Sequence, residues 1–356
     1  MEPTARELFD RILHYEPVDR MPVFHWGGWP ETIERWRAEG FPEGADEHAF
    51  FNASRISCGV GIEDGLFPPF EEEVIEETDD AKVIRQTDGV VAKHWKNKSC
   101  IPHYIDFTLK GEEGWDEYKR RLQPDPARIR ADLDEQIEKA LASDVPISVG
   151  TGSMIGWIRD WMGVENLALF AYDDRELLAE MVMTIADLQV WSLEQVLPKI
   201  TPDCGWGWED ICFRTGPLIS PDIFAEVVVP GYRKIADTLL KYGVDLYIVD
   251  SDGMIDHLIP HWLDGGVNVM FPVEIGAWQA DPAAMLKRYG KALRIYGGIN
   301  KIEIAKGRAA IDAEIERRLP LMRAGGYVPL PDHLVVPGTA LDDYRYYLDR
   351  IRALRF

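Results

Sequence analysis

Short apolar runs alternate with amphipathic segments along most of the chain. Residues 244–249 and 267–273 are rich in β-branched residues and too short for helices, so both predict strands that are buried on two faces. The segment between them, 254–263, has the pattern of an amphipathic helix and is followed by Gly265-Gly266. A strand, a helix and a second strand in this order indicate a right-handed βαβ unit.

The same alternation predicts eight strands, with helices between nearly all of them. The strands begin near residues 21, 56, 145, 206, 244, 267, 293 and 327. An amphipathic helix is predicted before them, over 4–16. Residues 71–108, after the second strand, form short alternating runs that indicate antiparallel strands. The pattern therefore predicts one α/β domain over 1–356: a (β/α)₈ TIM barrel with an N-terminal helix and an antiparallel insertion after strand two.

Two segments in the middle of the chain are relevant to the position of a candidate functional site. Residues 155–199 are predicted as one long helical tract, and 206–211 as a strand that carries Glu209 and Asp210. Successive strand residues face opposite sides, so at most one of these two carboxylates is expected to face the barrel mouth. Ser220 and Pro221 predict the N-cap and first residue of a helix that runs to 242.

Composition narrows the class of protein. A net charge of −22 argues against nucleic acid and anionic membranes as partners. No apolar run approaches the ~20 residues that a bilayer crossing requires, and the charged first residues lack the apolar core of a signal peptide. The four cysteines, Cys58, Cys100, Cys204 and Cys212, form no CxxC pair, which indicates a reduced, cytoplasmic location.

In a barrel, the carboxyl ends of all strands meet at one mouth, where ligands bind. Asp250-Ser251-Asp252-Gly253 follows the fifth predicted strand, and His333 follows the eighth. Carboxylates that converge with a histidine suit acid–base chemistry or a divalent metal. We predict a small-molecule site in which the catalytic residues are Glu209, Asp250, Glu274 and His333.

A second set of residues is expected to bind the substrate. Trp26 and Trp29 would cover its apolar side, and His103 and Tyr104 would reach the mouth from the antiparallel segment. The full set is His25, Trp26, Trp29, His103, Tyr104, Ser153 and Asn300.

Structural alternatives exist for several of these residues. Asp252 either caps the helix predicted from 254 or works in the site, and Glu274 is either a functional group or a rim carboxylate held by its neighbours.

Several blocks of the sequence, in order, resemble the uroporphyrinogen decarboxylase superfamily over nearly the whole chain. They are Ala5-Arg-Glu-Leu with Glu16-Pro-Val-Asp-Arg-Met-Pro22, Trp208-Glu-Asp-Ile with Gly216-Pro-Leu-Ile-Ser-Pro221, Gly297-Gly-Ile-Asn-Lys301, and Gly325-Gly-Tyr with Pro331-Asp-His333. The resemblance implies a (β/α)₈ barrel with its site at the strand carboxyl ends. It also implies one of two activities: decarboxylation of a tetrapyrrole, or transfer of a methyl group between a corrinoid and another molecule.

The resemblance favours the methyltransferase-like branch. True decarboxylases carry arginines after strand one, where this chain has Trp26-Gly-Gly-Trp29. Thiol-using methyltransferases bind zinc through a His-x-Cys pair after strand five and a cysteine after strand eight. The corresponding positions here are Asp250, Asp252 and His333, which would hold zinc or a harder ion, or no metal.

The implied partners are a corrinoid (cobalamin) as co-substrate, carried by a second protein, and a second copy of the chain in a homodimer. The alternatives are tetrapyrrole decarboxylation and a non-catalytic ligand-binding barrel.

Overall fold

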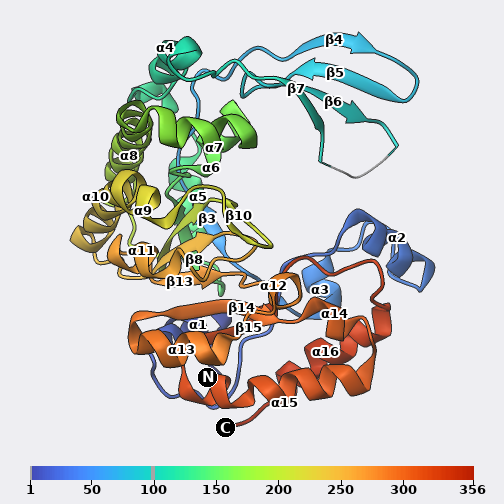
Figure 1. The fold of residues 1–356 in the computed structure, drawn as a ribbon. Coiled ribbons are helices and arrows are strands. Elements are labelled where there is room, and N and C mark those ends of the chain that lie inside the picture. The colour runs from blue at the N-terminus through green and yellow to red at the C-terminus, as the bar shows by residue number, and fades with distance from the viewer. Residues whose placement is uncertain (1, 98–100) are drawn as a thin grey trace.

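The computed structural model describes residues 2–97 and 101–356, and a parallel sheet of seven strands lies at its centre (Figure 1). The sheet is a curled half-barrel with the order β15-β14-β13-β12-β9-β8-β3, and every neighbouring pair is parallel. Its strands are β3 (Cys58–Val60), β8 (Ile147–Gly150), β9 (Cys204–Trp208), β12 (Tyr247–Asp250), β13 (Val269–Phe271), β14 (Arg294–Ile299) and β15 (Tyr327–Pro331). They correspond to seven of the eight predicted strands.

The first predicted strand lies beside this sheet rather than in it. It is the short strand β1 (Phe24–His25), which pairs in parallel with β2 (Ser54–Arg55) as a separate two-stranded sheet. A single bridge between Gly28 and Val335 joins the segment after β1 to the segment after β15. The α/β class is confirmed, whereas a closed sheet of eight strands stays a prediction.

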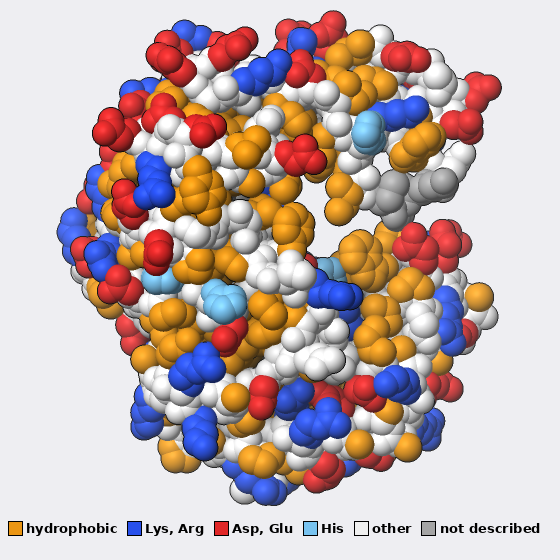
Figure 2. Space-filling view, viewed as in Figure 1, with side chains coloured by type: hydrophobic (Ala, Val, Ile, Leu, Met, Phe, Trp, Pro, Cys, Tyr) orange, Lys and Arg blue, Asp and Glu red, His pale blue; other side chains and the backbone are white. Residues whose placement is uncertain are grey.

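A second sheet extends away from the body of the molecule (Figure 1). Its four antiparallel strands are β4 (Glu73–Glu77), β5 (Ala81–Arg85), β6 (Val91–Trp95) and β7 (His103–Asp106), in that order. The antiparallel pairing predicted for 71–108 is therefore present. Cys100 lies outside the described residues. Figure 2 shows the face hollowed below this sheet, with hydrophobic side chains along the rim of the hollow.

Helices surround the central sheet, with α8 and α10 packed against each other and α15 packed against β15 and α16 (Figure 1). Within the described part of the chain, no helix combines the length and apolar character that a bilayer crossing requires. The helices are α1 (Ala5–Leu13), α2 (Pro30–Ala38), α3 (Glu47–Phe51), α4 (Glu112–Arg121), α5 (Leu133–Leu141), α6 (Gly156–Met162), α7 (Val164–Asp173), α8 (Arg175–Val196), α9 (Pro221–Ile223), α10 (Val229–Lys241), α11 (Ile259–Asp264), α12 (Ile275–Trp278), α13 (Pro282–Tyr289), α14 (Lys301–Ile304), α15 (Arg308–Ala324) and α16 (Leu341–Ala353).

Short elements complete the chain. Single 3₁₀ turns occupy Pro126–Arg128 and Gly290–Ala292, and a π-helical turn, Phe224–Val228, joins α9 to α10. The hairpin β10 (Cys212–Phe213) and β11 (Gly216–Pro217) follows β9. Ser220 caps α9 as predicted, since its Oγ accepts a hydrogen bond from the Ile223 N–H at 3.2 Å.

Three predicted elements have different bounds. The tract 155–199 contains three helices, because Gly163 (φ +87°) ends α6 and Asp174 caps α8 through the Leu177 N–H at 3.0 Å. The helix predicted from 254 begins only at Ile259, so Asp252 does not cap it and that structural alternative is wrong. The strand predicted over 206–211 ends at Trp208.

Aromatic side chains fill the interior of the half-barrel. The Phe271 ring centroid lies 5.0 Å from that of Trp206, 5.3 Å from that of Tyr296 and 4.6 Å from that of Trp26. Asp250 pairs in register with Phe271 on one side and with Trp208 on the other. Since paired residues of parallel strands face the same side, the Asp250 carboxyl lies at the edge of this aromatic layer.

Candidate functional site

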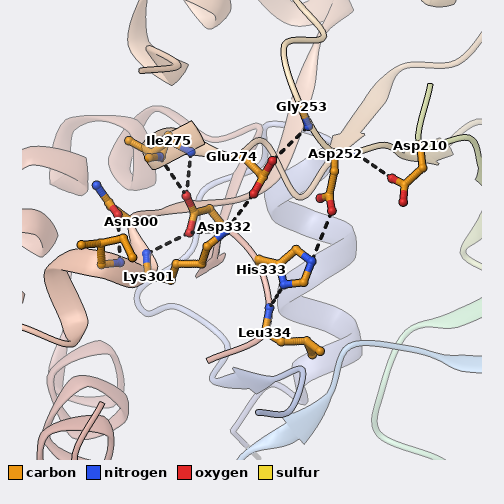
Figure 3. A network of polar contacts seen from close by, with 12 residues as sticks. Asp210, Asp252, Gly253, Glu274, Ile275, Asn300, Lys301, Asp332, His333 and Leu334 are labelled. Atoms are coloured by element: carbon orange, nitrogen blue, oxygen red, sulfur yellow. Dashed lines mark hydrogen bonds and ion pairs between the residues drawn. The ribbon is translucent and has the colours of Figure 1, made fainter. Parts of the chain in front are cut away.

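The predicted convergence of strand ends five and eight is present in the structure (Figure 3). The His333 Nε2 atom lies 3.2 Å from Asp252 Oδ2. The Leu334 N–H donates a hydrogen bond to His333 Nδ1 at 2.7 Å. Because Nδ1 accepts this bond, a neutral imidazole carries its hydrogen on Nε2, the nitrogen that faces Asp252. The pair is therefore a histidine of defined tautomer within ion-pair distance of a carboxylate.

Two indoles hold the imidazole of His333. The Trp29 ring stacks on it, with centroids 5.3 Å apart and planes 7° apart, and the Trp26 ring lies 5.4 Å away at 49°. Trp29 remains 39% exposed, so part of this side chain is accessible from outside. Substrate binding by Trp26 and Trp29 stays a prediction.

Asp250 lies beside this pair and differs from its neighbours in having no partner. In the described part of the chain, no donor forms a hydrogen bond or ion pair with its carboxyl group. Burial raises the pKa of Asp250 well above its usual range, and the negative charges of Asp210 and Asp252 raise it further. Asp250 therefore retains a proton to higher pH than an ordinary aspartate.

The structure places one further carboxylate, that of Asp210, beside Asp252. Its Oδ1 accepts a hydrogen bond from the Asp252 N–H at 2.8 Å (Figure 3), and its carbonyl oxygen accepts one from Arg159. Burial, and then the charge of Asp252, raise the pKa of Asp210. The residue has φ +49°, a conformation that aspartate tolerates better than most side chains. This turn places Asp210, rather than Glu209, next to the Asp252–His333 pair.

One carboxylate oxygen of Asp252 accepts no hydrogen bond from the described residues. Its Oδ2 contacts His333, whereas its Oδ1 is buried and has no hydrogen-bond partner within residues 2–97 and 101–356. A buried polar atom without a partner is unfavourable unless a ligand or water satisfies it. The site thus has acceptor capacity that the protein's described residues leave unused.

Glu274 supports the loop that carries Asp252. Its Oε2 accepts the Gly253 N–H at 3.0 Å, and its Oε1 accepts from Lys301 Nζ at 2.8 Å (Figure 3). Asp332 accepts the backbone N–H groups of Ile275 at 2.6 Å and Lys301 at 2.8 Å. Lys301 is consequently neutralised by these two carboxylates, and Glu274 fits the rim role better than the catalytic role.

Glu209 is fully buried and fully bonded. Its carboxylate accepts hydrogen bonds from five groups: the backbone N–H of Met154, Ile155 and Gly156 at 2.7–3.0 Å, Ser153 Oγ at 3.2 Å, and the Tyr232 hydroxyl. Burial raises the pKa of Glu209 although these bonds oppose the shift. Glu209 and Ser153 hold the start of α6, and neither side chain is left free for a ligand.

Four other predicted substrate-binding residues lie outside the cluster. His25 is 1% exposed, and its Nδ1 and Nε2 contact the Tyr344 hydroxyl at 2.7 Å and Glu47 Oε2 at 2.8 Å, so the structure corrects that prediction. Asn300 caps α14 through the Ile302 N–H at 2.9 Å. His103 and Tyr104 are exposed on β7, at an edge of the antiparallel sheet.

The predicted metal ligands do not form a preformed metal centre. Across residues 2–97 and 101–356, no group of three or more His, Cys, Asp or Glu side chains is arranged to hold an ion. Asp252 and His333 face each other, and Asp250 contacts neither. The three side chains as placed do not fit a zinc or harder ion.

A parallel α/β half-barrel with an acid, a carboxylate and a histidine at the strand carboxyl ends is typical of barrel enzymes. The sequence model of the family "Uroporphyrinogen decarboxylase (URO-D)" matches residues 114–354. That match covers more than half of the chain, so the chain belongs to the uroporphyrinogen decarboxylase family.

Among solved structures, a methyltransferase from Methanosarcina mazei is similar over 99% of this chain and 100% of its own, with a TM-score of 0.62. The two sequences are 15% identical, so this similarity establishes a shared fold. A comparison with curated proteins gives no match.

Proposed function

We propose that the protein transfers a methyl group from a small methylated substrate to a corrinoid carried by a partner protein. The observation that supports this most is the unpartnered Asp250, whose pKa is raised by burial, beside the Asp252–His333 pair at the strand carboxyl ends. The full-length similarity to a methyltransferase is consistent with it.

The residues of the site would act on the leaving group. When the bond between the methyl carbon and a heteroatom breaks, the electron pair stays on the heteroatom, which then requires a proton. Asp250 would donate that proton, and a positioned acid of this kind contributes roughly 10²–10⁴-fold to the rate. The Asp252–His333 pair would orient the heteroatom, and Trp29 would cover the apolar side of the substrate. The corrinoid, when bound, supplies the nucleophile that accepts the methyl group.

The charge of the site disfavours a tetrapyrrole with many carboxylates. Three carboxyl groups, on Asp210, Asp250 and Asp252, face the site. The nearby cations are already paired: Lys301 with Glu274, and Arg159 with Asp160 at 2.8 Å. A polyanionic substrate would meet uncompensated negative charge here.

A methyl-transfer assay tests the proposal. The purified protein is incubated with reduced cobalamin and a panel of methyl ethers, methyl thioethers and methylamines, and the methylated corrinoid is read from its absorption spectrum. We expect turnover of at least one compound. Asp250→Asn should lower kcat roughly 10²-fold or more, because the amide cannot donate an acidic proton.

Asp134→Asn serves as the matched control, since Asp134 is 79% exposed and lies on α5. It should leave the rate unchanged. Turnover of uroporphyrinogen that is lost in Asp250→Asn would instead establish the decarboxylase alternative. Ligand binding without any turnover would establish the non-catalytic alternative.

A further inference from the structure

A cavity lies apart from the strand-end site, between α6 and the loops at the base of the antiparallel sheet. Its volume is about 330 Å³, which is at the small end of the range for small-molecule sites, about 300–1,000 Å³. We call it the α6 cavity. Its walls include Leu66, Pro69, Asp88, Trp157, Asp160 and Trp161.

The only charged side chains among the lining residues are two aspartates. Asp88 Oδ1 accepts the Val90 N–H at 3.0 Å, and within residues 2–97 and 101–356 no cation pairs with its carboxylate. Asp160 pairs with Arg159 at 2.8 Å. Burial raises the pKa of both carboxyl groups, and the charge of Asp160 raises that of Asp88 further. The cavity thus holds one carboxyl group, that of Asp88, which has no paired cation among the described residues.

Aromatic rings form another part of the wall. The Trp157 and Trp161 rings lie 6.0 Å apart at 32°. Trp161 also packs on Tyr118 at 5.1 Å, and the Tyr118 hydroxyl donates to the Asp88 carbonyl oxygen at 2.7 Å. These contacts fix the indoles relative to Asp88. Indole faces beside a carboxylate suit an organic ammonium ion, because the ring face and the carboxylate both attract the positive charge.

We propose that the α6 cavity binds a small organic ammonium ion, with Asp88 opposite the charge and Trp157 and Trp161 against its alkyl groups. The Arg159–Asp160 pair separates this cavity from the strand-end site, since Arg159 also donates to the Asp210 carbonyl oxygen. The proposal does not depend on methyl transfer, and its test uses binding alone.

The test compares two probes of the same shape. Choline and 3,3-dimethylbutan-1-ol differ in that a carbon atom replaces the charged nitrogen. Each is titrated into the wild-type protein, and binding is followed by calorimetry and by tryptophan fluorescence. We expect the Kd of choline to be at least about tenfold lower than that of the alcohol. Equal affinities, or no saturable binding of choline up to about 10 mM, would overturn the proposal.

Variants then locate the bound ion. Asp88→Asn and Trp157→Leu should each weaken choline binding about tenfold or more, whereas Trp157→Phe should retain part of it because a ring face remains. Asp134→Asn and Asp252→Asn should bind choline as the wild type does. Loss of binding in Asp252→Asn with full binding in Asp88→Asn would place the cation at the strand ends and refute the proposal. Melting temperatures measured in parallel identify any variant that fails to fold.

Discussion

Two groups of carboxylates lie at the strand carboxyl ends, and they differ in how many hydrogen bonds they accept. Glu209 and Asp332 are fully buried, and backbone N–H groups of neighbouring loops donate to both of their oxygens. Asp250 has no donor among the described residues, and one oxygen of Asp252 has none. The first group holds loops in place and the second is free to meet a ligand. The number of accepted hydrogen bonds therefore separates the carboxylates that hold loops from those that are free to meet a ligand, and it does so better than burial does.

The largest effect is expected when a saturated carboxylate is removed. Glu209→Ala leaves three backbone N–H groups and two hydroxyls without their acceptor inside the protein. Each buried donor without a partner costs about 1–3 kcal/mol, so the free energy of unfolding should fall by at least about 3 kcal/mol. Urea denaturation measures this value.

The matched control for Glu209 is Glu135→Ala, at a site that is 63% exposed. It should change the free energy of unfolding by no more than about 0.5 kcal/mol. If Glu209→Ala lowered the free energy of unfolding as little as this control, a full set of accepted hydrogen bonds would not identify a structural carboxylate.

At Asp250 a substitution is expected to raise the free energy of unfolding rather than to lower it, because the folded protein holds this carboxyl group without partners. Its raised pKa means that the native state binds this proton more tightly than the unfolded state does. Wild-type stability should therefore fall as pH rises from about 4 towards the native pKa, by up to about 1.4 kcal/mol per pH unit. Asp250→Asn removes this loss.

The measurement is urea denaturation of both proteins at pH 5 and pH 8. The variant should gain stability relative to the wild type on going to pH 8. If the free energies of unfolding of the two proteins differed by the same amount at both pH values, this result would contradict the raised pKa of Asp250.

The smallest change in stability is expected for Asp252→Asn. The Asp252 and His333 side chains are 32% and 18% exposed, and partly exposed ion pairs contribute about 0–1 kcal/mol. The free energy of unfolding should therefore change by less than about 1 kcal/mol, while the methyl-transfer rate falls. Thermal denaturation and the cobalamin assay on one preparation measure both quantities. A large loss of stability would assign Asp252 to the structural group.

The sequence predicted the meeting of Asp252 and His333 because it depends on one general rule. Buried strands appear as short apolar runs, and the carboxyl ends of parallel strands share an edge. The rule does not depend on the detailed course of the loops. It therefore predicted correctly that residues following β12 and β15 lie close together.

The errors have local causes. The prediction for Glu209 assumed that a regular strand continues to 211, whereas the chain turns at Asp210 with φ +49°. Ile211 hid this turn, because it is apolar and buried although it lies beyond the end of the strand at Trp208. His25 was misplaced because β1 has two residues, too few for a pattern to show which one faces inward.

The antiparallel sheet has a further consequence for association between molecules. Its edge strand β4 is exposed at all five residues, and three of them are Glu73, Glu76 and Glu77. Unpaired strand edges invite pairing with other chains, and charges along them oppose it. Two copies aligned at this edge would bring six glutamates together, so these charges oppose edge-to-edge pairing of β4 between molecules.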